Sequence, residues 1–170
     1  GCGSARDVDE HLVGLGKVLR LKKAQRHLAG STYQHLKRIR HVKEKGRLIC
    51  PNPSYVTEVV TRLGLENCKP VPTPSIELLR PSEDDKEEPL DEEQASEHRS
   101  LTCTLLYASH DIPEVQFTLR MLTTDPRTPT KPSWERLKRC TRYLKGVQDE
   151  GAWFGRDGRF DTLLLSSDTD

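Results

Sequence analysis

The 170-residue sequence is poor in aromatic residues, which make up 5% of it, and it contains no apolar run long enough to cross a bilayer. No signal-peptide pattern opens the chain. Its apolar content of 34% is too low for one large hydrophobic core. We therefore expect no membrane partner and a modest core beneath a strongly charged surface.

Paired cysteine motifs are also missing. The five cysteines are widely spaced, and none forms the Cys-x-x-Cys pair that suits a zinc or redox site. Their odd number favours free thiols over a disulfide framework. We expect an intracellular, reducing environment, and the sequence does not distinguish cytoplasm from nucleus.

Charge is abundant and segregated along the chain, although the formal net charge is only +1. Residues 17–47 carry many basic side chains and one acid, Glu44. Residues 77–97 are mainly acidic, and residues 131–145 are basic again. This pattern predicts two basic surfaces joined by a solvated acidic linker.

The spacing of apolar residues, together with residues that begin or end helices, predicts where the helices lie. An amphipathic helix is expected over 8–26, weakened by Gly14 and Gly16. Asp111 followed by Pro113 indicates another helix start. The remaining helices are expected over 53–64, from about 92, and over 132–145.

Hairpins are expected at two places. Strands over 36–42 and 47–50 flank a tight turn in which Gly46 supplies a positive φ. Residues 152–154 and 160–165 form a closing hairpin. The proline-rich stretch 69–74 should run extended, and 75–91 should be a disordered acidic linker. The elements together indicate an α+β protein, mostly helical, with boundaries at 1–52, 53–74, 75–91, 92–147 and 151–170.

The most informative stretch is the basic helix near the carboxyl end. Leu137, Cys140 and Leu144 share one side of it, and the helix stops at Gly146, which can adopt a positive φ. The other side carries basic residues that we expect to contact a phosphate backbone: Lys138, Arg139, Arg142 and Lys145. A solvated face on an ordinary surface helix is the alternative. Arg38 and Arg40 are a second candidate set, with solvated strand charges as the alternative.

A series of short motifs follows the same order and spacing as in one known family. The motifs are Leu36-Lys37-Arg38, Pro53-x-Tyr55-Val56, Leu63-Gly64-Leu65-Glu66-Asn67-Cys68-Lys69-Pro70, Thr73-Pro74, Arg99-Ser100-Leu101, Leu105-Leu106-Tyr107 and Lys138-Arg139-x-x-Arg142-Tyr143-Leu144-Lys145-Gly146. Together they resemble the copia-type retrotransposon Pol polyprotein over about residues 33–170.

The resemblance implies a reverse transcriptase layout. Residues 1–52 would form the edge of the palm, 92–147 the thumb and connection helices, and 151–170 the first strands of a ribonuclease H-like domain. Several positions depart from the family pattern and suggest a diverged or decaying copy: His35-Leu36-Lys37, His98-Arg99, Cys103 and Ile112-Pro113-Glu114-Val115.

Catalytic carboxylates are expected mostly outside this sequence. The Tyr-x-Asp-Asp turn of the family should precede it, and Val8-Asp9-Glu10 is a weak match that fits an acidic helix start better. By resemblance, Asp168 is the first metal-binding carboxylate of ribonuclease H; a solvated terminal acid is the alternative. Magnesium would serve the parent enzyme, an RNA-directed DNA polymerase, and the fragment alone should be inactive.

Two functions are therefore expected from different classes. In the first, the chain grips an RNA/DNA template–primer duplex within the rest of the Pol polyprotein. In the second, it is a domesticated or decayed remnant that acts as a protein-interaction module or has no function.

Overall fold

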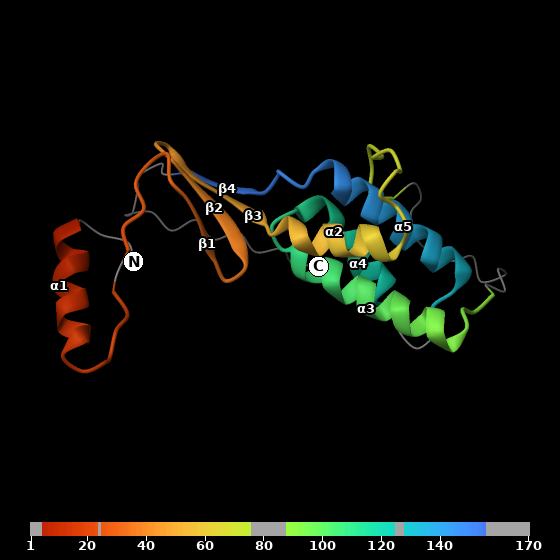
Figure 1. The fold of residues 1–170 in the computed structure, drawn as a ribbon, viewed down its shortest axis with the longest axis horizontal. Helices are drawn as coiled ribbons and strands as arrows, with labels where there is room; N and C mark the ends of the chain where they lie inside the picture. Colours follow the sequence, from red (N-terminus) through yellow and green to blue (C-terminus); the bar gives the residue numbers. More distant parts are fainter. Residues whose placement is uncertain (1–4, 24, 76–87, 125–127, 156–170) are drawn as a thin grey trace, which may run out of the picture.

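The computed structural model describes residues 5–23, 25–75, 88–124 and 128–155, and it has the α+β fold that the sequence predicts (Figure 1). Within these residues, five helices accompany one four-stranded antiparallel sheet. The elements in chain order are α1 Ala5–Gly16, β1 Thr32–His35, β2 Arg38–Lys43, β3 Gly46–Pro51, α2 Pro53–Arg62, α3 Glu92–Ser109, α4 Pro113–Leu122, α5 Lys131–Gly146 and β4 Ala152–Gly155.

The molecule is elongated, with the sheet between helix α1 and the bundle formed by α2, α3, α4 and α5 (Figure 1). The main hydrophobic cluster lies in the bundle, and each of its four helices contributes to it. Its buried members are Val56, Val59, Val60, Leu101, Leu105, Ile112, Val115, Leu119, Leu122, Leu137, Cys140 and Leu144. Burial of this apolar surface is the main force that assembles the bundle.

Helix α5 forms where the sequence predicts it, but the predicted way in which it stops is wrong. Gly146 is its last residue and has no positive φ, and Val147 is the C-cap. Thr130 is its N-cap, and Thr130 and Ser133 make a reciprocal capping box. Leu137, Cys140 and Leu144 lie on one face at helical spacing and are each 0% exposed. This apolar face packs into the main cluster of the bundle.

The starts of α2 and α3 also follow from local sequence. The side-chain oxygen of Asn52 accepts a hydrogen bond from Ser54 N at 3.0 Å, and that of Asp91 accepts one from Gln94 N at 2.8 Å. Helix α2 stops before Gly64, whose φ of +64° is the left-handed conformation expected of a terminating glycine.

Helix α4 begins at Pro113 as predicted, but Asp111 is not its cap. The N-cap position is Ile112, which makes no side-chain capping hydrogen bond. Asp111 is buried, and its carboxylate pairs with Arg38 of β2. The acid therefore connects the bundle to the sheet instead of capping a helix.

The predicted length of the first helix is wrong. Helix α1 ends at Gly16, and Val18, Leu19 and Leu21 beyond it are exposed. Glycine in a helix interior costs about 1 kcal/mol relative to alanine, so Gly14 and Gly16 weaken continuation of the helix. The apolar residues past this point have no packed face that would offset the cost.

The predicted hairpin between β2 and β3 is confirmed, with Lys43 opposite Gly46, although its first strand begins at Arg38 and not at Leu36. The conformational reason for Gly46 is wrong, because positive-φ glycines in the described chain are Gly30 and Gly64. A Cβ at Gly46 would instead collide with the Phe154 carbonyl oxygen and lie 2.7 Å from the Trp153 ring. Gly46 is needed for the close approach of β4.

Strand β4 pairs antiparallel with β3, which gives the sheet order β1-β2-β3-β4. Residues 160–165, expected as its hairpin partner, lie outside the described residues. The same holds for residues 76–87 of the acidic linker, for Cys2 and for Asp168.

The turn between β1 and β2 has a conformation that its sequence does not favour. Leu36 and Lys37 have φ values of 50° and 59°, and they connect the paired residues His35 and Arg38. Two positive φ values in a two-residue loop define a type I′ turn, which normally uses asparagine and glycine. Side chains with a Cβ are strained there.

His98 of α3 is buried without a partner for one of its ring nitrogens. It is 1% exposed, its ring centroid lies 6.2 Å from that of Trp134, and Nε2 has no hydrogen-bond partner among the described residues. Burial lowers the pKa of His98 below 6.5, and a backbone hydrogen bond at Ser133 partly opposes this effect. Above pH 6.5 the folded protein therefore favours the neutral imidazole.

The double substitution Leu36→Asn/Lys37→Gly should stabilise the protein. Relief of the left-handed strain is worth about 1 kcal/mol per residue, which thermal unfolding would register as a higher melting temperature. The matched control is Glu44→Asn/Lys45→Gly in the β2–β3 turn, where neither residue has a positive φ. A gain of equal size in the control would contradict the assignment of strain to the first turn.

The variant His98→Phe should flatten the dependence of stability on pH. Because the folded-state pKa of His98 lies below 6.5, the unfolded chain takes up the proton first. Wild-type stability should therefore fall as the pH drops from above 6.5 through the folded-state pKa. Urea unfolding at pH 7.5 and pH 5.5 measures this slope, with the exposed His11→Phe as control; equal flattening in both variants would rule out His98 as the cause.

Candidate nucleic-acid interface

Of the six basic residues predicted to contact phosphates, four lie on α5, and all four are half-buried. Three of them reach residues 65–73, the segment that follows α2 and that we call the strap. Lys145, Arg142 and Arg139 each donate hydrogen bonds to it. The basic side of α5 is therefore not a freely solvated face.

Lys145 has all of its donors occupied. Its ammonium group donates to the carbonyl oxygens of Leu65 at 3.2 Å, Glu66 at 2.6 Å and Cys68 at 2.9 Å. An ammonium group has three N–H donors, so none remains for a phosphate while these bonds hold. The structure gives Lys145 an internal role, as the anchor of the strap.

Arg142 and Arg139 are fixed differently. Arg142 Nε donates to the Lys69 carbonyl oxygen at 3.0 Å, and Arg139 Nη2 donates to Thr73 Oγ1 at 2.9 Å. A guanidinium group carries five N–H donors, and each of these bonds uses one. Arg139 Nε is buried, so the donors that Arg139 keeps for a phosphate oxygen are on its two Nη atoms, and Arg142 likewise keeps its Nη donors.

Lys138 makes a different contact. Its ammonium group lies 2.7 Å from Glu135 on the same helix, and the two side chains are 33% and 69% exposed. Pairs of this kind contribute about 0–1 kcal/mol, so a phosphate can replace the carboxylate at little cost. Of the four predicted residues on α5, Lys138 is the one whose partner is most easily exchanged.

Arg38 is engaged inside the protein. Its Nε lies 2.9 Å from Asp111 Oδ2, and the Asp111 side chain is 7% exposed. Burial raises the pKa of Asp111, while the positive charge of Arg38 acts in the opposite direction. Arg38 thus compensates a buried carboxylate where the sheet meets the bundle.

Arg40 belongs to a second basic surface. Its guanidinium carbon lies 6.0 Å from the centroid of the Tyr33 ring. Cross-strand register pairs Tyr33 with Arg40, Val42 with Arg47, and Arg47 with Phe154, so these residues share one side of the sheet. We call Tyr33, Arg40, Arg47 and Phe154 the arginine face.

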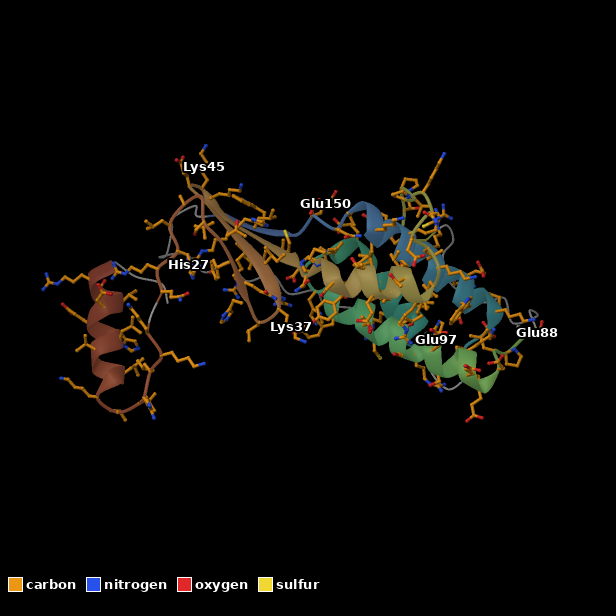
Figure 2. The ribbon with its side chains drawn as sticks, viewed as in Figure 1. His27, Lys37, Lys45, Glu88, Glu97 and Glu150 are labelled. Atoms are coloured by element: carbon orange, nitrogen blue, oxygen red, sulfur yellow. The ribbon has the colours of Figure 1, made fainter. Side chains whose placement is uncertain are left out.

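Arg47 is not among the residues predicted from the sequence to bind phosphates. The alternation of residues along a strand could have placed it on the same face as Arg40. Arg38, Arg40 and Val42 occupy every second position of β2, and the turn at Glu44 fixes which residues of β3 oppose them. Other exposed cations lie at the ends of the sheet, where Figure 2 labels Lys37 and Lys45.

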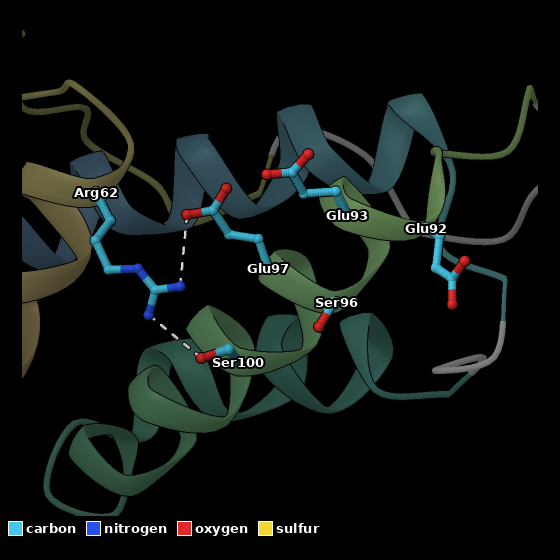
Figure 3. Close-up of a pocket in the computed structure, with 6 residues that line it drawn as sticks. All are labelled: Arg62, Glu92, Glu93, Ser96, Glu97 and Ser100. Atoms are coloured by element: carbon cyan, nitrogen blue, oxygen red, sulfur yellow. Dashed lines mark hydrogen bonds and ion pairs between the residues drawn. The ribbon is translucent and has the colours of Figure 1, made fainter.

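A groove of about 780 Å³ lies between α2 and α3 (Figure 3). It is lined by Arg62, Glu92, Glu93, Ser96, Glu97 and Ser100. The only cation among these, Arg62, contacts Glu97 at 3.5 Å and Ser100 Oγ at 3.3 Å. Its excess of carboxylates repels phosphates, so the groove is not part of a nucleic-acid surface.

The described residues offer no metal centre. No three His, Cys, Asp or Glu side chains in those ranges gather as a metal site. Cys50, Cys68, Cys103 and Cys140 are free thiols, and burial raises the pKa of Cys140 to about 12. Nor is any helix in the described ranges both long and apolar enough to span a bilayer.

Two of the known proteins to which the chain is similar come from Arabidopsis thaliana. The chain is 29% identical over 119 residues to the retrovirus-related Pol polyprotein from transposon RE2, a stretch covering 68% of this chain and 8% of the polyprotein. It is 24% identical over 112 residues to an uncharacterized mitochondrial protein, covering 66% of this chain and 45% of that protein. No family model and no solved structure matches the chain. The resemblance to retrotransposon Pol polyproteins is thereby confirmed, and it spans a minor part of each relative.

The single variant Arg38→Met should destabilise the protein more than the double variant Arg38→Met/Asp111→Leu. The single change leaves a buried carboxylate without its counter-charge, which costs about 1–3 kcal/mol, whereas the double change removes both charges. Urea unfolding at pH 7.5 measures the difference. If the single and double variants unfold alike, Arg38 is not compensating Asp111.

Proposed function

We propose that this chain is part of a retrotransposon reverse transcriptase–ribonuclease H and that it grips the template–primer duplex through its basic surfaces. The similarity to a stretch of a Pol polyprotein supports the retroelement origin. The α+β fold, with a helical bundle beside a small sheet, agrees with the palm-edge and thumb layout that the motif order implies. The remaining support comes from the arrangement of charge.

The observation that carries the proposal is the pair Arg139 and Arg142. Residues three apart on a helix share one face, and here both guanidinium groups are held in place by one hydrogen bond each. Arginine binds phosphate oxygens through two parallel N–H donors, and its geometry is set before the ligand arrives. Two such groups one turn apart suit the backbone of a duplex strand.

The arginine face of the sheet offers a second contact. Arg47 and Phe154 are exposed on it. The Tyr33 ring is already stacked on His27 and lies beside Arg40, so Phe154 is the aromatic residue left for stacking. Aromatic and basic side chains together bind nucleic acid through stacking and phosphate contacts without reading base sequence. Binding of this kind positions a duplex by its shape.

The chain would position nucleic acid while other parts of the polyprotein perform catalysis. Phosphoryl transfer needs carboxylates that hold two metal ions, and the family supplies them from other segments. Asp168 is proposed as the first ribonuclease H carboxylate, and magnesium would bind there together with further carboxylates of the parent enzyme. The described residues contribute binding groups, not the metal ligands.

One observation favours the alternative, a remnant that acts as a protein-interaction module. Val13, Val18, Leu19, Leu21 and Leu28 are between 44% and 83% exposed. Apolar side chains gathered in one exposed segment are typical of surfaces that contact another protein. None of these five apolar residues belongs to α5 or to the arginine face, so the two functions respond to different substitutions.

The variant Arg139→Gln/Arg142→Gln should bind an RNA–DNA heteroduplex more weakly and with a flatter salt dependence. Each phosphate contact contributes about −0.9 to the slope of log affinity against log salt, so losing two should make the slope less negative by about 1.8. Fluorescence anisotropy of a labelled heteroduplex with the full 170-residue chain, between 50 and 200 mM salt, measures affinity and slope.

The control Arg120→Gln/Lys131→Gln removes the same charge from exposed positions of α4 and α5. It should leave the slope unchanged, and circular dichroism should find all three proteins folded. The proposal is overturned if the wild-type chain does not bind the heteroduplex, or if both double variants change the slope equally.

A further inference from the structure

We propose that the strap, residues 65–73, is a positioning element for phosphate binding: its backbone and Thr73 hold Arg142 and Arg139, and Lys145 anchors it to α5. The identity of the ligand rests on the proposed function above. The positioning role of the strap goes beyond it, because the strap itself need not touch nucleic acid.

The contacts between the strap and α5 follow a regular order. Leu65, Glu66 and Cys68 meet Lys145, then Lys69 meets Arg142, and Thr73 meets Arg139. The strap therefore runs antiparallel to α5 and makes one group of contacts per helical turn. A segment without secondary structure of its own is in this way held along almost two turns of the helix, from Arg139 to Lys145.

The amino-terminal end of the strap is fixed most firmly. Leu65 N donates to the Val60 carbonyl oxygen at 2.9 Å, and Cys68 N donates to the Leu65 carbonyl oxygen at 3.1 Å. These bonds turn three carbonyl oxygens toward a single point, which the Lys145 ammonium group occupies. Charge-assisted hydrogen bonds of this type are stronger than neutral ones.

Gly146 and the prolines keep the rest of the strap close to the helix. A Cβ at Gly146 would lie 2.9 Å from Pro70 Cβ, so glycine at this position lets the strap approach α5. Pro70, Pro72 and Pro74 restrict the backbone to extended conformations. The acceptors for Arg142 and Arg139 are therefore held by a stiff segment.

Holding the arginines in advance should strengthen phosphate binding. A free arginine side chain loses rotamer freedom when it binds, and this loss opposes association. The strap imposes much of that order during folding, so less remains to be lost on binding. Lys145 contributes to affinity only through the strap, because its own donors are occupied.

The decisive variant is Lys145→Met in the full 170-residue chain, compared with Lys131→Met on the same helix. Lys131 makes an exposed pair with Glu88, so its loss should change heteroduplex affinity less than two-fold. Lys145→Met should weaken affinity about ten-fold because two side chains lose their fixed positions. Its salt slope should equal that of the control, since no phosphate contact is removed directly.

A second substitution tests the same claim without altering charge. Thr73→Val removes the acceptor for Arg139 and should weaken binding a few-fold at unchanged slope, whereas Thr73→Ser keeps a hydroxyl and should restore it. Amide hydrogen exchange at Cys68 reports whether the strap is released in Lys145→Met. This pair keeps the inference testable if Lys145→Met does not fold.

The possible outcomes separate the two proposals. If the wild-type chain does not bind the heteroduplex, the proposed function fails and this inference fails with it. If the wild type binds but Lys145→Met makes the slope of log affinity against log salt less negative by about 0.9, Lys145 contacts phosphate itself. Its role as the anchor of the strap is then overturned. If the wild type binds and releasing the strap leaves affinity unchanged, or Thr73→Val matches the wild type, the positioning role is overturned while the proposed function stands.

Discussion

Helix α5 is constrained on two sides, and most of the bundle depends on it. One side places Leu137, Cys140 and Leu144 in the hydrophobic cluster, so the helix cannot rotate without exposing apolar surface. The other side presents Arg142 and Lys145 to the strap. The helical period assigns these residues to separate faces, and burial of the first face fixes the direction of the second.

The sheet and the bundle are joined through a small number of polar contacts. The Arg38–Asp111 pair crosses this junction, and the Cys50 thiol donates to the Asp149 carbonyl oxygen at 3.6 Å. Lys37 lies 5.9 Å from the Tyr55 ring centroid at the same junction. Because the hydrophobic cluster lies only in the bundle, the arginine face and the basic side of α5 stay on separate structural units of one elongated molecule (Figure 1).

Much of the fold followed from local sequence. Asn52, Asp91 and Thr130 each cap a helix where the apolar spacing begins, and Gly64 ends one. These signals work because the groups they satisfy lie within a few residues of the helix end. The prediction for α1 was too long because apolar spacing alone does not supply a packing surface.

The candidate site was less accessible to sequence reasoning. Charge spacing correctly put Arg139 and Arg142 on one helix face, but it treated Lys145 as their equivalent. Asp111 was interpreted only as the sign of a helix start. The partners of Lys145 and Asp111 lie far away in the chain. Lys145 donates a hydrogen bond to Leu65, and Asp111 pairs with Arg38. A motif identifies a residue type and its spacing, whereas hydrogen-bond partners depend on which segments are brought together.

The sequence by itself determined the α+β class, the helix boundaries set by caps and prolines, and the likeness to retrotransposon Pol polyproteins. These properties depend on near neighbours in the chain and on the order of motifs. The tertiary structure alone decided which cations are engaged internally, why Gly46 and Gly146 are glycines, and that Arg47 joins Arg40 on one face. Each of these depends on contact between distant segments, and burial of the apolar faces, not local preference, brings those segments together.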